Sequence, residues 1–273
     1  MYNFELLALY NNSWGNFDFN ATLGGNLYKV NNQTIVTTAK DMKIRDVVAL
    51  MSFNEVSVEP YSYRKQINSI YGAVNLGWKH MLYFDATLRG DQSSTLPISN
   101  NMYIYPSFSG SFVFSELLKL GDKLPYGKVR MSWAQVGSDT DPYQLGLVYT
   151  KSKFAYPGYT IGYISNGTIP NKDLKPTKTN SFEMGLELKF LKNRIGLDFT
   201  YYSQLSKNQI MGMASSSTSG YGYRLINAGE IENKGVEIAL NTRPIQTKDF
   251  SWDLNFNFSK NSNKVKKLVD DMD

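Results

Sequence analysis

Few residues of this chain combine types and spacing that could do chemistry. His80 is the only histidine, and it stands beside Lys79 with no second ligand or base close to it in the sequence. We therefore assign it no metal or catalytic role. The serine-rich stretch 214–223 has no neighbouring base that could activate a nucleophile, so it is typical of a flexible loop. Asp139 and Asp141 could ligate calcium through loop oxygens, although acidic pairs of this kind usually only solvate a loop.

The other charged residues of interest fall where a strand would place them on its wet face. They are Asp85, Arg89, Lys128, Arg130, Glu183, Glu187, Asp198 and Glu237. Two carboxylates held about 5–10 Å apart could hydrolyse a glycosidic bond, but nothing in the sequence fixes two of them at that separation. We expect opposite charges to pair across strands instead. The sequence predicts neither an enzyme nor a cofactor.

One aromatic segment could bind a sugar. The stretch KFAYPGYTIGYISNGTIPN, residues 153–171, places Tyr156, Tyr159 and Tyr163 among glycine and proline. Tyrosine rings stack on sugar rings, and their hydroxyls exchange hydrogen bonds with them. The alternative is that these rings pack the loop against its neighbours or against a lid protein. We hypothesise that the three tyrosines contact substrate.

The composition excludes several classes of protein. Aromatic residues make up 14% of the 273 residues and charged residues 19%, below the roughly 25% of a typical soluble domain. The absence of cysteine rules out disulfides, thiolate metal sites and cysteine nucleophiles. The net charge of +5 is spread along the chain, and no nucleic-acid recognition module frames it. Because no apolar run is long enough for a spanning helix, this mixture favours a sheet with one wet and one dry face.

Strict alternation of apolar and polar residues predicts the strands of that sheet. In the stretch 15–25 every second residue, from Phe17 to Leu23, is apolar and the residues between are polar. The same pattern recurs at 73–78, 82–89, 128–133, 182–190, 195–202 and 252–258. Successive side chains of a strand point to opposite faces, so we expect about ten strands.

The connections between these strands alternate between short and long. Short links fall near residues 12–15, 79–80, 191–193 and 244–249, with a somewhat longer one at 116–125, and long links fall at 31–63, 92–101, 137–176 and 206–221. Outer-membrane barrels have short periplasmic turns and long external loops, and aromatic girdles at the membrane surfaces. The aromatic residues beside the short links are Trp14, Trp78, Phe190, Phe250 and Trp252. This favours an antiparallel up-and-down transmembrane β-barrel over the alternative, a soluble or surface β-sandwich that binds carbohydrate.

Three segments resemble a known family. RGDQSSTLPISNNMYIYPSFSGSFVFSE (89–116), GKVRMSWAQVGSDTDPY (127–143) and GEIENKGVEIALNTRP (229–244) are similar to the barrel region of the SusC/RagA family, TonB-linked outer-membrane transporters of Bacteroidetes-type bacteria. The resemblance covers most of residues 66–264. It implies a barrel of about 22 strands with an N-terminal plug inside. It also implies import of large nutrients, oligosaccharides in most members and peptides in some, with a SusD-like surface lipoprotein as lid and energy from the TonB complex.

The chain departs from the family pattern at both ends. It shows no signal peptide, TonB box or plug domain, and no terminal strand that ends in an aromatic residue. We therefore expect residues 1–273 to be an internal part of the barrel domain, with its wet face toward the lumen, its dry face toward outer-membrane lipid, and TonB engaged through a missing N-terminal region. Unpaired sheet edges cannot be satisfied in lipid, so we expect that this piece alone neither inserts nor conducts.

Overall fold

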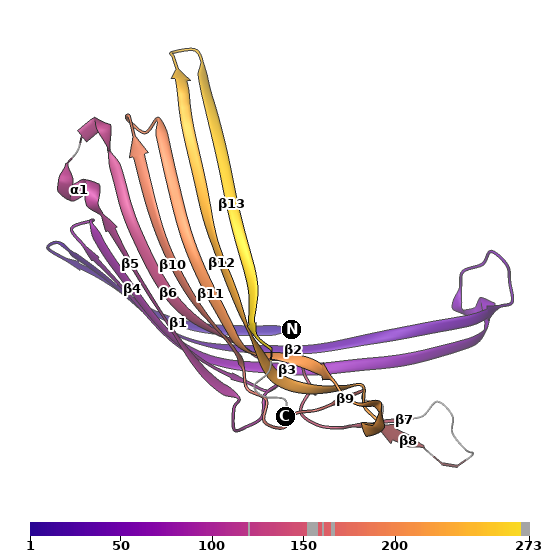
Figure 1. The fold of residues 1–273 in the computed structure, drawn as a ribbon. Helices are drawn as coiled ribbons and strands as arrows, with labels where there is room; N and C mark the ends of the chain where they lie inside the picture. The colour runs from indigo at the N-terminus through magenta and orange to yellow at the C-terminus, as the bar shows by residue number, and fades with distance from the viewer. Residues whose placement is uncertain (120, 152–157, 160, 165–166, 269–273) are drawn as a thin grey trace.

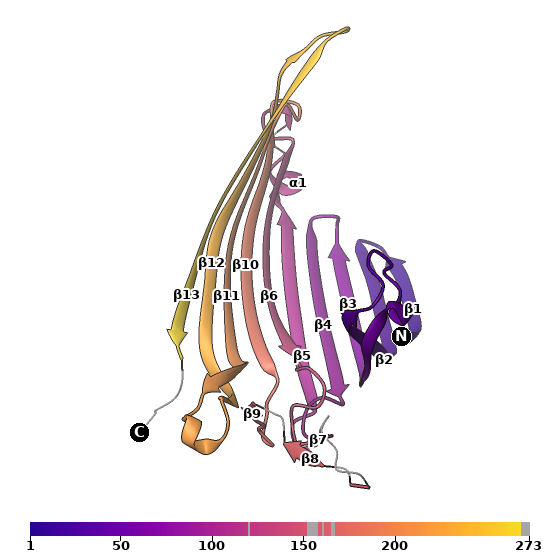
Figure 2. The same cartoon turned by 90° about the vertical axis from the view of Figure 1, so that its right-hand side faces the viewer.

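The computed structural model describes residues 1–119, 121–151, 158–159, 161–164 and 167–268. Within these residues almost the whole chain forms one antiparallel sheet (Figures 1 and 2). Its long strands follow the order β1-β2-β3-β4-β5-β6-β10-β11-β12-β13. The strands are β1 (Tyr2–Trp14), β2 (Phe17–Met42), β3 (Phe53–Trp78), β4 (Leu82–Ser93), β5 (Met102–Val113), β6 (Tyr126–Ser138), β10 (Thr177–Phe190), β11 (Ile195–Ala214), β12 (Tyr223–Gln246) and β13 (Ser251–Lys267).

Small elements lie in the connections. The two-residue strand β9 (Thr168–Ile169) pairs in parallel with β12, and β7 (Tyr149–Lys151) pairs with β8 (Gly162–Ile164) in a separate two-stranded sheet. The helices are short: α1 (Phe114–Leu118), η1 (Leu50–Ser52), η2 (Gly121–Lys123) and η3 (Ser217–Ser219). No helix of the described residues is long and apolar enough to cross a membrane.

Tight turns join the strands at one end of the sheet, which we call the short-turn end. Gly15 in the β1–β2 turn has a φ of +60°, and Lys79 and His80 in the β3–β4 turn have φ of 51° and 54°. The left-handed region suits glycine, and histidine enters it more readily than most side chains. His80 is therefore a turn residue in this structure, with its Nδ1 atom 4.0 Å from the carboxylate of Asp18.

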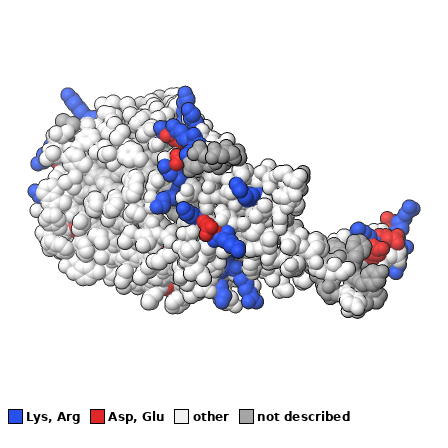
Figure 3. Space-filling model, turned by 60° about the horizontal axis from the view of Figure 1, so that its bottom comes forward, with Lys and Arg blue, Asp and Glu red and all other residues white. Residues whose placement is uncertain are grey.

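The opposite end, the long-loop end, differs from the sequence prediction in one respect. Residues 31–63 were expected to form a long link, but β2 and β3 continue as a paired ladder up to the Met42–Phe53 pair. The resulting hairpin extends far from the rest of the sheet (Figure 1), and charged side chains gather at its tip (Figure 3). Likewise β11 runs to Ala214, well into the stretch 206–221 expected to be loop. Apolar residues fall on both faces of these segments, for example Ile35 and Val36 of β2 and Ile210 and Met211 of β11, so hydropathy alone did not reveal the strands.

Buried apolar residues are few in the part of the chain that the structure describes. They are Leu96, Val113, Leu174, Leu225 and Ala228. Large apolar side chains on the sheet remain open instead: Leu6 is 70% exposed, Phe84 46% and Phe256 59%. A sandwich buries its dry faces against each other. The single layer of described strands, with its apolar face uncovered, therefore contradicts the alternative β-sandwich.

Candidate functional site

The ladder register sorts the side chains of the sheet into two faces. Residues directly opposite each other in neighbouring strands share a face. On the apolar face one row of partners reads Leu186, Phe199, Ile238 and Phe258, and the next reads Leu188, Leu197, Leu240 and Phe256. The neighbouring residues in these strands point to the opposite face, where the corresponding row of partners is Glu187, Asp198, Ala239 and Asn257. The sheet thus has one face for an apolar medium and one for water.

The apolar rows form a belt of limited height. On β10 it runs from Phe182 to Phe190, and beyond it toward the long-loop end the same face carries Asn180 and Lys178. On β3 it runs from Ile70 to Trp78. These spans match the about 9–11 residues that a tilted strand needs to cross the hydrocarbon of a bilayer.

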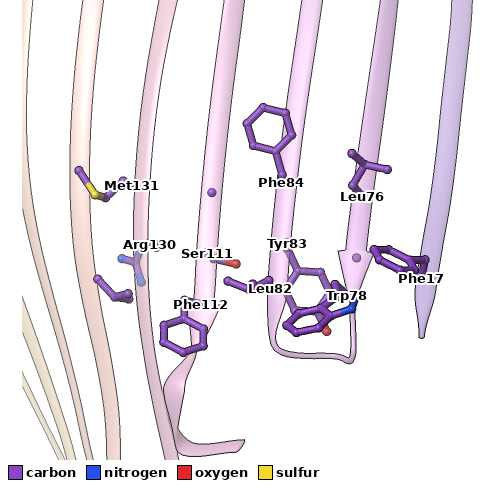
Figure 4. A pocket seen from close by; sticks show the side chains of 13 residues that line it. Phe17, Leu76, Trp78, Leu82, Tyr83, Phe84, Ser111, Phe112, Arg130 and Met131 are labelled. Carbon is purple, nitrogen blue, oxygen red and sulfur yellow. The ribbon is translucent and has the colours of Figure 1, made fainter. Parts of the chain in front are cut away.

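Aromatic rings mark the short-turn edge of this belt. Trp78 lies 6.4 Å from Phe17 between ring centroids, and the Nζ atom of Lys79 lies 4.8 Å from the centre of the Trp78 ring. The sheet is hollowed here (Figure 4). Gly110, which has no side chain, is among the residues that line the hollow. The hollow has a volume of about 520 Å³, and Leu76, Phe84 and Met131 are among the side chains around it. The predicted aromatic positions Trp14, Trp78 and Phe190 all end strands at this edge.

Arg130 is the centre of an ionic cluster on the polar face. Its Nη1 and Nη2 atoms donate to the two carboxylate oxygens of Asp198 at 3.0 and 2.9 Å, and Nη2 also donates to Thr200 Oγ1 at 2.7 Å. Glu183 lies 3.9 Å away. Gly185 stands directly opposite on β10, and a Cβ atom there would come within 2.5 Å of the arginine Nε. The missing side chain of Gly185 therefore gives the guanidinium room to lie flat across the ladder.

A second ionic cluster lies closer to the long-loop end of the same face. Arg89 donates from Nε to Asp91 Oδ1 at 2.9 Å and from Nη2 to Ser69 Oγ at 3.0 Å. Tyr105 donates to the other oxygen of Asp91, which is only 6% exposed. The guanidinium also lies over the ring of Tyr71, 5.4 Å from its centre. Asp91 and Tyr105 were not among the residues singled out from the sequence. Their mutual hydrogen bond joins β4 to β5, and only the pairing of these two strands reveals it.

The remaining charged residues predicted from the sequence lie on this polar face as well. Asp85 accepts hydrogen bonds from Asn75 and Ser109, and Lys128 stands opposite Glu187. Glu237 is exposed, opposite Thr200 and Ser259. It borders a polar hollow of about 560 Å³ that Arg130 and Asp198 also line. The eight charged positions therefore form one surface across β4, β6, β10, β11 and β12.

The two residues of the acidic pair considered for calcium have different surroundings. The Oδ1 atom of Asp139 lies 2.7 Å from Lys65 Nζ, and the hydroxyls of Ser93 and Thr95 donate to its Oδ2 atom. Asp141 is exposed. Among the described residues no group of three or more histidine, cysteine, aspartate or glutamate side chains could hold a metal ion. Asp139 thus ties the β6 end to β3 and to the loop after β4.

The long loops pack together beside Asp139. Leu96 from the β4–β5 loop, Leu174 and Leu225 form a buried cluster, with Tyr103, Leu145 and Ile210 against it. Asn227 fastens the same region: its Oδ1 accepts from the backbone N–H of Lys175 at 2.7 Å, and its Nδ2 donates to the carbonyls of Lys175 and Asn208 at 2.7 and 3.1 Å. This role of Asn227 was not predicted from the sequence. Its side chain hydrogen-bonds to backbone groups of distant segments, and no local sequence pattern indicates such contacts.

The described part of the predicted tyrosine segment lies at this end too. Tyr159 is 74% exposed, and Tyr163 is 50% exposed in β8, where its backbone pairs with Thr150 of β7 (Figure 1). Tyr156 lies outside the described residues. The two described rings are thus available to a ligand or to another protein.

Comparison with known proteins identifies the family. The model of the family described as "TonB dependent receptor-like, beta-barrel" matches residues 2–271. TonB-dependent receptor P3 of Formosa agariphila is 29% identical over 97% of this chain and 27% of its own length, and SusC of Bacteroides thetaiotaomicron is 30% identical over 78% and 22%. The chain thus spans about a quarter of the length of the curated relatives it matches.

A solved structure shares the fold. The RagAB peptide importer in its closed-closed state superimposes with a TM-score of 0.88 over 99% of this chain and 30% of that chain, at 22% sequence identity. These matches confirm the resemblance to the SusC/RagA family and the partial antiparallel barrel expected from the sequence. The chain therefore belongs to the TonB-dependent receptor β-barrel family and is an outer-membrane protein of the Bacteroidetes type.

Proposed function

We propose that residues 1–273 form part of the barrel wall of an outer-membrane transporter that imports large nutrients. One observation carries the proposal: a single-layer sheet with an uncovered apolar belt on one face and a continuous polar surface on the other. A barrel in lipid needs the first face outside, and a hydrated passage needs the second inside. No bond is made or broken in this function, which agrees with the receptor family to which the chain belongs.

The edges of the sheet indicate how the chain takes part. Both β1 and β13 have a neighbour on one side only in the described sheet. Unpaired backbone groups are not tolerated in hydrocarbon, so further strands must cover these edges in the membrane. We propose that a larger barrel supplies them and that its lumen holds a plug. Coupling to TonB would then use a segment outside residues 1–273.

The cargo we propose is an oligosaccharide, captured with a SusD-like lipoprotein at the long-loop end. The exposed rings of Tyr159 and Tyr163 support this, since they offer stacking surfaces at that end. Tyr156 belongs to the same proposed contact. A peptide is the second candidate, because the RagAB neighbour is described as a peptide importer.

Growth of the source bacterium tests this function. A strain with the gene disrupted should fail to grow on one class of oligosaccharide as sole carbon source and should recover with the restored gene. Tyr159→Ala with Tyr163→Ala should reduce uptake of that glycan while the protein stays at normal abundance in the outer membrane. Loss of growth on peptides alone would reassign the cargo. Undiminished growth on every glycan and peptide, or recovery of the protein outside the membrane fraction, would refute the transporter.

A further inference from the structure

Lysines are concentrated on one part of the outer wall, just beyond the apolar belt toward the long-loop end. We call them the outward lysine cluster: Lys178 of β10, Lys207 of β11, Lys234 of β12, and Lys260, Lys264, Lys266 and Lys267 of β13. These seven lysines share their surface with only two carboxylates among the described residues of these strands' outward face, Glu230 and Glu232. The surface is therefore strongly cationic.

The register shows that the cluster directly borders the belt. Moving along the apolar face toward the long-loop end, the row Leu186, Phe199, Ile238, Phe258 is followed by a row that ends in Val236 and Lys260. The next row contains Lys234, the row after it Glu232 opposite Lys264, and the last row Lys178, Lys207, Glu230 and Lys267. Each row advances two residues, about 7 Å. On β12 and β13 the charges therefore begin directly after Val236 and Phe258, the last apolar residues of the belt on those two strands.

Two details indicate that this surface is organised to receive an anion. Lys178 and Lys207 stand directly opposite each other on neighbouring strands, and like charges in that position repel. Glu230 offsets the charge of Lys207, and a bound anion would offset that of Lys178. The β-bulge between Val265 and Lys267, opposite Glu230–Ile231, brings Lys266 to the side of Glu232, where its Nζ lies 3.0 Å from Oε2. Bulges commonly redirect a side chain in this way.

Glu232 holds two of the lysines in place. Its Oε1 binds Lys234 Nζ at 2.7 Å and its Oε2 binds Lys266 Nζ at 3.0 Å, and the carboxylate side chain is only 18% exposed. Lys207 is fixed in the same way by Glu230, at 2.9 Å. The glutamates thus position the ammonium groups beside the belt without neutralising the whole set.

The other half of the sheet carries fewer cations past the belt. The outward positions of β2–β4 there include two, Lys29 and Arg64, beside Asn68 and Gln92. If the membrane surface required cations equally on every strand, the lysines would be spread evenly over the sheet. The concentration of seven of them on β10–β13 indicates a particular binding surface.

We infer that the outward lysine cluster binds the phosphate groups of lipid headgroups in the outer leaflet. Long-loop ends of outer-membrane barrels face the cell exterior, so the cluster lies at the level of the outer-leaflet headgroups. Lysine stems reach along apolar surface while their ammonium groups stay in water, and clustered lysines recognise phosphorylated headgroups. The inference depends on the membrane placement in the proposed function, and it is independent of the cargo.

Native mass spectrometry of the complete gene product, purified from outer membranes in mild detergent, tests the inference with added lipid A as the probe. Lys178→Gln with Lys207→Gln, and separately Lys234→Gln with Lys266→Gln, should weaken lipid A binding about fivefold for each lysine removed. Lys29→Gln, an exposed lysine beyond the belt on β2, is the matched control and should bind like the unmodified protein. Dephosphorylated lipid A should bind the unmodified protein as weakly as lipid A binds the variants.

Three outcomes would overturn the inference. They are equal lipid A retention by the cluster variants and the Lys29→Gln control, equal retention of lipid A with and without its phosphates, and cross-linking of the cluster lysines to a protein partner in intact membranes. Each leaves the transporter proposal standing, provided that the unmodified protein is in the membrane and uptake continues. Absence of the unmodified protein from the membrane would refute both proposals together.

Discussion

Replacing Gly185 by alanine should lower the stability of the folded barrel only when Arg130 is present. In the wild-type ladder an alanine Cβ at position 185 would lie 2.5 Å from Arg130 Nε and 2.8 Å from its Cγ, so the arginine side chain must leave its place. Leaving breaks hydrogen bonds of 3.0, 2.9 and 2.7 Å to Asp198 and Thr200. Each is worth about 0.5–1.5 kcal/mol net, and we take the low end because Arg130 and Asp198 are about a third exposed.

These values give about 1.5–2 kcal/mol of destabilisation for Gly185→Ala, and a similar loss for Arg130→Ala. In the Arg130→Ala background the clash disappears, and alanine is a better strand residue than glycine by roughly 0.5–1 kcal/mol. Gly185→Ala should then be neutral or stabilising. The double-mutant cycle should therefore show a coupling energy of about 2 kcal/mol.

Equilibrium unfolding in urea measures the stability of all four proteins in this cycle. The complete gene product is refolded in liposomes, and its unfolding is followed by tryptophan fluorescence. The unfolding free energies of the two single variants and the double variant are each compared with the wild type. Additivity within about 0.5 kcal/mol would refute the reasoning, because it would mean that position 185 does not sense the arginine.

Three further predictions concern other parts of the sheet. Ile238→Arg, in the middle of the belt, should destabilise the inserted barrel by about 2–4 kcal/mol, whereas Ala239→Arg on the polar face should cost less, as measured by folded yield in liposomes; equal costs would argue against the assignment of faces. Asn227→Ala should expose the segment before β10 to limited proteolysis, with a loss of about 2 kcal/mol, and Asn227→Asp should fall between wild type and alanine since it keeps one acceptor; unchanged cleavage would contradict this. Lys65→Met leaves Asp139 without its cation and should loosen the β4–β5 loop, seen as faster amide hydrogen exchange there; protection at the wild-type level would show that the ion pair is dispensable.

Much of the sheet was predictable because a strand buried on one face repeats with period two. Phe182 to Phe190 and Ile195 to Tyr201 show this period, and they pair in the register that keeps both apolar sets together. A slip by one residue would put Glu187 or Asp198 on the apolar face, so hydropathy also fixes the register.

The parts that escaped prediction depend on contacts between distant residues. The β2 part of the β2–β3 extension carries apolar residues on both faces, such as Ile35 and Val36, so hydropathy does not distinguish the faces there. The partners of Asn227 and of Asp139 come from segments far away in the sequence. The outward lysine cluster could be found only after the register had placed four strands side by side.

Lipid accessibility along β12 tests the central claim most directly. This chain contains no cysteine, so single cysteines at 236–240 can carry a spin label without a competing site in it. In the complete protein reconstituted in liposomes, labels at Val236, Ile238 and Leu240 should collide with oxygen dissolved in the bilayer. Labels at Glu237 and Ala239 should collide with a water-soluble nickel reagent instead. Loss of this alternation, or shielding of the even-numbered positions from both reagents, would contradict the placement of the apolar face against lipid.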